Sequence, residues 1–144
     1  MIEGGCRCGA VRYTLAIAAV PATYACHCLN CQTWSGGAFA QQVLLMESAI
    51  QAEGPVIEYR FQSPTGSESH QRICGVCHTR IYNTNSALPG IAVVRAGTLD
   101  ESDKLETPLH IWAKRKQPWL TLPADAKVFE ESADAAELMK VFAR

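Results

Sequence analysis

Seven cysteines in the chain fall into three tight groups whose spacing suits metal binding. The groups are Cys6-Arg7-Cys8, Cys26-His27-Cys28-Leu29-Asn30-Cys31 and Cys74-Gly75-Val76-Cys77. Sulfurs that share one tetrahedral zinc ion lie less than about 4 Å apart, because each zinc–thiolate bond is about 2.3 Å long. A two-residue spacer brings two sulfurs to that separation. A one-residue spacer does so where the backbone kinks, as Gly4, Gly5 and Gly9 permit around the first group.

The first and last groups can complete one four-cysteine site. Each supplies half of a tetrahedron, so one ion would join two segments separated by residues 9–73. A closed site of this kind works as a cross-link, and metal coordination supplies about 10 kcal/mol or more of folding free energy in small zinc domains. We therefore predict a structural zinc at Cys6, Cys8, Cys74 and Cys77.

The middle group leaves Cys26, Cys28 and Cys31 for a second ion. Three protein ligands with one open position are typical of catalytic zinc, whose fourth place takes water or substrate. Alternatively, one of the four histidines closes this site as well: His27, His70, His78 or His110. A third interpretation is a reversible disulfide with one spare thiol, since crowded thiols without metal are prone to oxidation.

Composition indicates one globular domain and argues against two kinds of partner. The chain has 144 residues, 48% of them hydrophobic, and a formal net charge of −1. Nucleic-acid binders usually carry an excess of lysine and arginine, which is missing here. No stretch approaches the roughly 20 apolar residues that span a bilayer, and the N-terminus lacks the pattern of a signal peptide. We expect a single domain over residues 1–144 in the cytoplasm, where thiols stay reduced.

The elements that must position these cysteines are mainly strands. Residues 11–15 alternate apolar and polar side chains, which is the period-two pattern of a half-buried strand. Further strands are predicted over residues 39–45, 56–61, 68–73, 80–83, 91–95 and 109–113. One helix is predicted at the C-terminus, where Asp134 can cap it and Glu137 follows three residues later. Residues 32–37 are expected to form a loop behind the middle cysteines.

Longer strings of sequence around these cysteines resemble a known family. The strings are Gly4-Gly5-Cys6-Arg7-Cys8-Gly9-Ala10-Val11-Arg12-Tyr13, Cys26-His27-Cys28-Leu29-Asn30-Cys31-Gln32, Ser35-Gly36-Gly37-Ala38-Phe39, Cys74-Gly75-Val76-Cys77 and Pro108-Leu109-His110-Ile111-Trp112. They resemble the glutathione-dependent formaldehyde-activating enzymes, a family that also includes centromere protein V. The resemblance runs from the N-terminus to around Pro123.

The resemblance implies a mainly β structure, the β-tent fold of stacked antiparallel sheets held together by zinc. It implies structural zinc ligands at Cys6, Cys8, Cys74 and Cys77, and catalytic zinc ligands at Cys26, Cys28 and Cys31. Family members are described as carbon–sulfur lyases that act on the adduct of glutathione and formaldehyde. One departure concerns the last knuckle, where the family usually has glycine after the final cysteine. Here His78 follows Cys77, so the turn there is open to differ.

The open trio and the resemblance together favour an enzyme with two zinc ions per chain. A small thiol, with glutathione as the candidate, would bind the open zinc position as thiolate and attack an aldehyde carbon. The reverse reaction would cleave the C–S bond of an S-hydroxymethyl adduct. His27 would point away from the metal and is predicted to take part in proton transfer, the alternative being a hydrogen-bonded structural histidine. Two other functions stay open: a non-catalytic zinc module that binds a protein partner, and a thiol redox sensor built on the trio.

Overall fold

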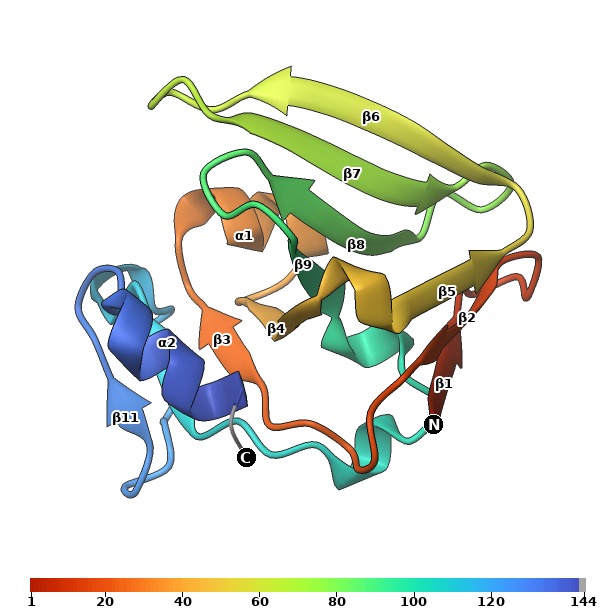
Figure 1. Ribbon diagram of the computed structural model, residues 1–144. Helices are drawn as coiled ribbons and strands as arrows, with labels where there is room; N and C mark the ends of the chain where they lie inside the picture. Colours follow the sequence, from red (N-terminus) through yellow and green to blue (C-terminus); the bar gives the residue numbers. More distant parts are fainter. Residues whose placement is uncertain (143–144) are drawn as a thin grey trace. The chain divides into compact units, whose positions relative to one another are not determined.

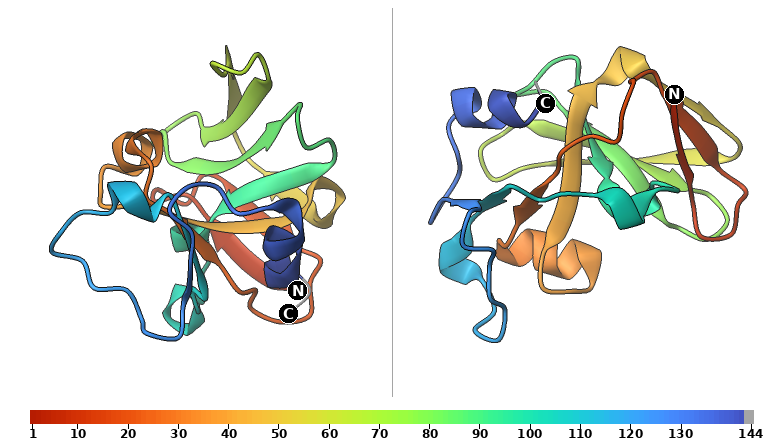
Figure 2. Two further views of the ribbon diagram at one scale, coloured as in Figure 1. Left: turned by 90° about the vertical axis from the view of Figure 1, so that its left-hand side faces the viewer. Right: turned by 90° about the horizontal axis from the view of Figure 1, so that it is seen from below.

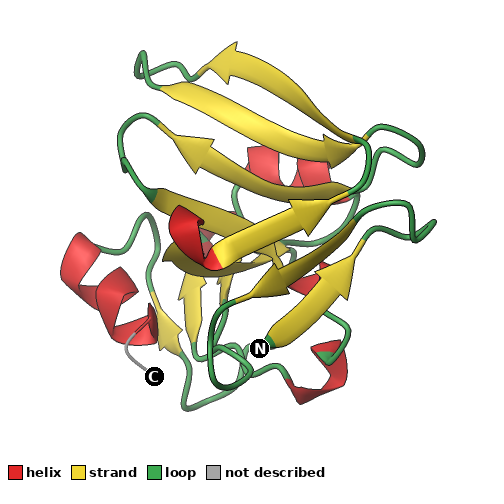
Figure 3. Cartoon of the chain, turned by 45° about the vertical axis from the view of Figure 1, so that its right-hand side comes forward, coloured by secondary structure: helices red, strands yellow, loops and turns green. Residues whose placement is uncertain are grey.

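The computed structural model describes residues 1–142, and most of its regular structure is strand (Figure 3). The strands are β1 Ile2–Gly5, β2 Arg12–Leu15, β3 Tyr24–Cys26, β4 Ala40–Met46, β5 Ile50–Glu53, β6 Val56–Gln62, β7 Glu68–Cys74, β8 Arg80–Asn85, β9 Ile91–Arg95, β10 Leu109–Ile111 and β11 Lys127–Val128. The α-helices are α1 Leu29–Ser35 and α2 Ala135–Phe142. The prediction of a mainly β fold with a short C-terminal helix is confirmed. Residues 143 and 144 of the predicted domain lie outside the described residues.

The chain divides into two compact units, each built from two stretches of sequence. The first unit comprises Met1–Val20 and Leu44–Lys104, and the second comprises Pro21–Val43 together with the chain from Leu105 onward. Within residues 1–142, no helix is both long and apolar enough to cross a membrane.

The first unit contains two groups of antiparallel strands. In one, β2 lies between β1 and β5, with Tyr13 opposite Gly4 on one side and Ala52 on the other. Figure 2 shows β1 and β2 as a hairpin at the N-terminus. In the other, β6, β7, β8 and β9 are neighbours in that order. Alternating side chains of these strands form the buried interior, in which Leu15, Ile81 and Val94 are fully buried.

The second unit combines antiparallel and parallel pairing. Strand β3 pairs antiparallel with β4, whereas β10 lies between β3 and β11 and runs parallel to both. The antiparallel arrangement that the resemblance implies therefore holds for β3–β4 and for the ladders of the first unit, but not for those of β10. The β3–β10 register sets Ile111 opposite Cys26 and His110 opposite Ala25, so β10 lies directly beside the middle cysteine group.

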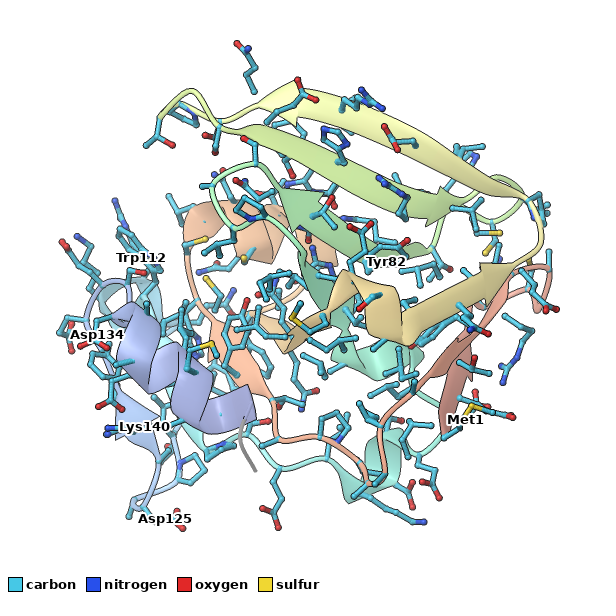
Figure 4. The ribbon with its side chains drawn as sticks, in the orientation of Figure 1. Met1, Tyr82, Trp112, Asp125, Asp134 and Lys140 are labelled. Carbon is cyan, nitrogen blue, oxygen red and sulfur yellow. The ribbon has the colours of Figure 1, made fainter. Side chains whose placement is uncertain are left out.

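Helix α2 begins where the sequence predicts. Asp134 Oδ1 accepts a hydrogen bond from the backbone N–H of Glu137 at 2.8 Å, which is the contact of a helix N-cap. Figure 4 labels Asp134 at the start of α2 and Lys140 towards its end. The Glu137 carboxylate pairs with Lys127 of β11 and with Lys140 of its own helix, so it ties α2 to β11.

Gly54, between β5 and β6, occupies a position that only glycine tolerates easily. Its φ is 102°, and a Cβ placed there would lie 2.1 Å from the backbone carbonyl oxygen of Ala10. Gly54→Ala should therefore lower the free energy of unfolding by about 3 kcal/mol or more, from backbone strain and overpacking together. Denaturant unfolding measures the change. Gly97→Ala is the control, since no atom lies within 4 Å of its added Cβ. Equal stability of the two variants would contradict the close approach.

Candidate metal centres

The four cysteines predicted to form a closed site meet in the first unit. Their sulfurs all lie within 4.8 Å of one another. The Sγ atom of Cys8 is 3.5 Å from that of Cys6 and 3.9 Å from that of Cys74. Sulfurs around a tetrahedral zinc ion are separated by about 3.8 Å, as follows from a bond length of about 2.3 Å. The group therefore has the ligand chemistry and the spacing of a structural zinc site.

Local backbone structure directs N–H groups at these sulfurs. After β1 the chain turns so that the N–H of Val11 lies 3.3 Å from Cys6 Sγ, and Gly9 completes this turn with a φ of 80°. At the end of β7 the N–H groups of Val76 and Cys77 approach Cys74 Sγ at 3.4 and 3.5 Å. Hydrogen bonds donated to sulfur favour its charged thiolate form, which is the form that binds metal.

Thr79 is a residue of this site that the sequence analysis missed. Its Oγ1 lies 3.1 Å from Cys77 Sγ and also accepts a hydrogen bond from the backbone N–H of Arg7 at 3.3 Å. The hydrogen bonds from Thr79 lower the pKa of Cys77 to about 5. A hydroxyl residue two positions after a predicted ligand is the signal that could have identified it. Thr79 thus joins the two halves of the four-cysteine group.

His78 shows how the last knuckle turns without glycine. Its φ is 61°, in the left-handed region, and its N–H donates to the carbonyl of Cys74 at 3.0 Å. The turn after Cys77 therefore keeps a conformation that glycine favours, although the side chain differs from the family pattern. A non-glycine residue in this region costs about 1–2 kcal/mol.

His78→Gly should relieve that strain and leave the metal site intact. We expect an unchanged zinc content and a gain of up to about 1 kcal/mol in the free energy of unfolding. Relief of the backbone strain stabilises the variant, and the gain stays small because glycine loses more backbone entropy on folding. Thermal unfolding with metal analysis measures both quantities. A clear loss of stability would mean that the imidazole contributes more than its backbone conformation costs.

The three middle cysteines come together in the second unit. Cys26 ends β3, Cys28 precedes α1 and Cys31 lies in the first turn of α1, and their sulfurs are all within 4.8 Å of one another. No further Cys, His, Asp or Glu ligand atom from residues 1–142 joins this group. The described part of the chain thus offers an ion three thiol ligands, which is the arrangement predicted for an open site.

Helix α1 takes up residues 32–35 of the loop expected over residues 32–37, and Gly36 and Gly37 lie outside the helix. Its N-cap is Cys28, whose Sγ accepts a hydrogen bond from the N–H of Cys31 at 3.4 Å. It ends at Ser35, and its C-cap is Gly36, which has a φ of 67°. The N–H groups of Gly36 and Gly37 donate to the carbonyl oxygens of Thr33 and Gln32, respectively. The expectation was wrong for residues 32–35 because a cysteine caps this helix in place of the usual serine, threonine, aspartate or asparagine. The two glycine N–H groups are used in ending the helix.

The three thiols of the trio ionise together only if a cation is bound beside them. Hydrogen bonding with Cys31 and burial both raise the pKa of Cys26, and burial raises that of Cys28. Three neighbouring thiols therefore resist ionising together in the absence of a positive charge. A bound divalent ion reverses this balance, because it favours the thiolate form of each ligand. The side-chain amide of Gln42, on β4, adds a donor 4.0 Å from Cys31 Sγ.

Comparison with known proteins tests the resemblance. The model of a family described as glutathione-dependent formaldehyde-activating enzyme matches residues 1–115, which include all seven cysteines. The chain belongs to this family. It is also similar to a crystal structure of a Rhodobacter sphaeroides protein, with a TM-score of 0.54 and 18% identity over 69% of this chain and 88% of that one. That similarity concerns the fold alone. No curated protein matches the chain.

In this member of the formaldehyde-activating family, His27 forms a buried pair with His110. His27 is fully buried between His110 and Phe39, whose rings each have centroids 5.3 Å from its own. Its Nε2 lies 2.9 Å from Nδ1 of His110, while its Nδ1 is buried without a hydrogen-bond partner among the described residues. Burial, His110 and Lys116 lower the pKa of His27 to about 4, and burial also lowers that of His110. Both rings are therefore neutral at pH 7, so one donates and the other accepts.

The histidine pair should contribute measurably to stability. His110→Leu leaves Nε2 of His27 buried without its partner, which should cost about 1–3 kcal/mol. His110→Gln keeps a hydrogen-bonding side chain in β10 and should recover part of that loss. Urea unfolding of the two variants measures the difference. Equal stabilities would show that the hydrogen bond between the imidazoles contributes little.

Proposed function

We propose that the protein is a zinc-dependent carbon–sulfur lyase that forms or cleaves the adduct of a small thiol with an aldehyde. S-hydroxymethylglutathione is the candidate substrate, because the family is described by glutathione and formaldehyde. The observation that carries the proposal is the trio of Cys26, Cys28 and Cys31, which gathers three thiols and no fourth ligand from the described residues. The reducing cytoplasm, where these thiols would be preserved, is the proposed location.

The cysteine groups fit zinc in donor chemistry and spacing. Thiolate sulfur is a preferred zinc ligand, and both groups hold their sulfurs within 4.8 Å. Two ions per chain follow, one at Cys6, Cys8, Cys74 and Cys77 and one at the trio. When bound at the trio, zinc supplies an open position at which a substrate thiol is held as thiolate.

The chain's own residues hold the trio in place. Cys28 and Cys31 are fixed by the first turn of α1, and Cys26 by its place in β3. The side-chain amide of Gln32 donates to the carbonyl oxygens of His27 at 2.8 Å and Arg115 at 3.0 Å. These two hydrogen bonds connect the segment that carries the trio to the residues that follow β10. The ligands are thereby arranged before substrate arrives, which limits the entropy lost on binding.

His27 is the proposed carrier of the reaction's proton. When glutathione adds to formaldehyde, the S–C bond forms, the C=O π bond opens, and the proton lost by sulfur ends on the oxygen. If Nε2–H of His27 donates to Nδ1 of His110, Nδ1 of His27 presents a lone pair. That atom is buried and has no partner among the described residues, which supports a role beyond packing. His110 then acts by fixing the tautomer.

Metal analysis and label exchange test this function. Protein purified under reductant should hold two zinc ions per chain, one released by chelator before the other. With glutathione and ¹³C-formaldehyde, NMR exchange spectroscopy should show faster transfer of label into the adduct than the uncatalysed reaction gives. One tight ion with no acceleration for any small thiol and aldehyde would contradict the proposal. Rapid disulfide formation by the zinc-loaded trio under mild peroxide would favour the redox sensor instead.

A further inference from the structure

Strand β6 ends its sheet with an unpaired edge. It pairs with β7 over its whole length, from Val56 opposite Cys74 to Gln62 opposite Glu68, and Figure 1 shows β7 beside it. Among residues 1–142 no strand pairs with the other edge of β6. An exposed strand edge offers unpaired N–H and C=O groups and is a ready template for another strand.

Hydrogen bonds at the two ends of the β6–β7 hairpin show which residues face that edge. The N–H of Ser63 donates to the carbonyl of Ser67, and the N–H of Gly75 donates to that of Pro55, both at 2.7 Å. Bonded pairs alternate along an antiparallel ladder, so the odd-numbered residues of β6 direct their backbone groups at β7. The even-numbered residues direct theirs at the free edge.

Beyond Val56, the even-numbered side chains of β6 are charged or polar and the odd-numbered ones are apolar. Glu58 and Arg60 lie on one face of β6 and form an ion pair there. Ile57, Tyr59 and Phe61 lie on the other face, where the rings of Tyr59 and Phe61 are 5.8 Å apart. Ile57 is 49% exposed and Tyr59 51% exposed, so the apolar row is open to a further contact.

We propose that β6 pairs antiparallel with β6 of a second copy of this chain, about a two-fold axis at Tyr59. In this register Glu58 lies opposite Arg60 of the partner subunit, and Ile57 opposite Phe61 of the partner subunit. The pairing joins the outward-facing backbone groups of Glu58 and Arg60 on both chains. It also continues the apolar row across the interface, as a two-fold contact requires of a self-complementary surface.

Charge selects this register over its neighbours. Only shifts by two residues keep outward groups opposite outward groups, because the side-chain and hydrogen-bond patterns repeat every two residues. A shift in one direction sets Arg60 opposite itself, and a shift in the other sets Glu58 opposite itself. Like charges directly opposite each other destabilise a strand pair. In the register centred on Tyr59, both Glu58 and Arg60 lie opposite a residue of the opposite charge.

The oligomeric state tests the proposal, and Arg60 provides the variants. The wild-type protein should sediment as a dimer. Arg60→Glu turns both charged pairs into like-charge pairs and should raise the dimer dissociation constant about ten-fold or more, whereas Arg60→Lys should leave it nearly unchanged. Arg60→Pro should block pairing but keep the fold, because the Arg60 N–H faces the free edge.

Circular dichroism and zinc content, both expected to be unchanged, check that each variant is folded. A wild-type protein that stays monomeric up to its solubility limit would overturn the proposal. So would a dimer that survives Arg60→Pro, because it would use a different surface. Neither result bears on the lyase reaction, since the readout is mass alone and Arg60 belongs to neither cysteine group.

Discussion

Cys74→Ser should remove one zinc ion per chain and a large part of the free energy of unfolding. Cys74 is fully buried at the end of β7, 3.9 Å from the sulfur of Cys8, and its sulfur is the target of two backbone N–H groups. A serine hydroxyl does not replace a thiolate as a zinc ligand. An ion present at about 1,000 times its dissociation constant stabilises the folded state by about 4 kcal/mol, a large share of the roughly 5–15 kcal/mol of a typical domain. Atomic absorption and urea unfolding measure the two losses.

The same substitution in the other group is the matched control for Cys74→Ser. Cys28→Ser should also remove one ion, but with a much smaller loss of stability. If Cys74→Ser fails to accumulate, chelator titration of the wild-type protein gives the same information. Release of the tighter ion should then coincide with unfolding followed by circular dichroism. Retention of both ions by Cys74→Ser, or release of the tight ion without unfolding, would show that the four cysteines are not a structural site.

Cys28→Ser should abolish the adduct reaction while the protein stays folded. Cys28 supplies one of the three thiols of the trio and also caps α1, because its Sγ accepts a hydrogen bond from the N–H of Cys31. Serine is a good N-cap, so the helix should persist when the ligand is lost. Replacement of residues that merely support a ligand costs about 10–100-fold in metal affinity or activity, so loss of a ligand itself should cost about 100-fold or more. Label exchange and zinc content measure the effect.

Two further variants separate the ligand from the helix. Cys28→Ala removes the N-cap of α1 as well as the ligand. It should lower the free energy of unfolding by about 1 kcal/mol more than Cys28→Ser does. Thr33→Ala, at an exposed position of the same helix, should change neither zinc content nor exchange rate. The open site would have to lie elsewhere if Cys28→Ser retained two zinc ions and the full rate.

The elements that sequence predicted are those with local patterns. Strands β2 and β6 show alternating apolar and polar side chains over most of their length, and α2 begins at a recognisable cap, Asp134. The cysteine groups were predictable for the same reason, because the spacing inside each group already fixes which sulfurs can meet. Partition of the seven cysteines into four and three agrees with the sets that the fold brings together.

The features that sequence did not predict depend on contacts between distant residues. Strand β3 is short and buried on both faces, so Tyr24, Ala25 and Cys26 show no alternation. Helix α1 starts at a cysteine cap that no propensity rule includes. The pairing of His27 with His110 spans 83 positions and exists because β10 runs parallel to β3, a pairing that neither strand's pattern indicates.

The two cysteine groups differ in how much chain must be present before an ion can be held. Cys26, Cys28 and Cys31 are near neighbours in sequence, so a nascent chain can capture a metal there soon after they leave the ribosome. Binding to unfolded chain adds little to the free energy of folding. The four-cysteine group cannot hold an ion until Cys77 has been synthesised and the end of β7 has folded against the turn that carries Cys6 and Cys8. The ion acquired last during synthesis would therefore be the one that keeps the native protein from unfolding.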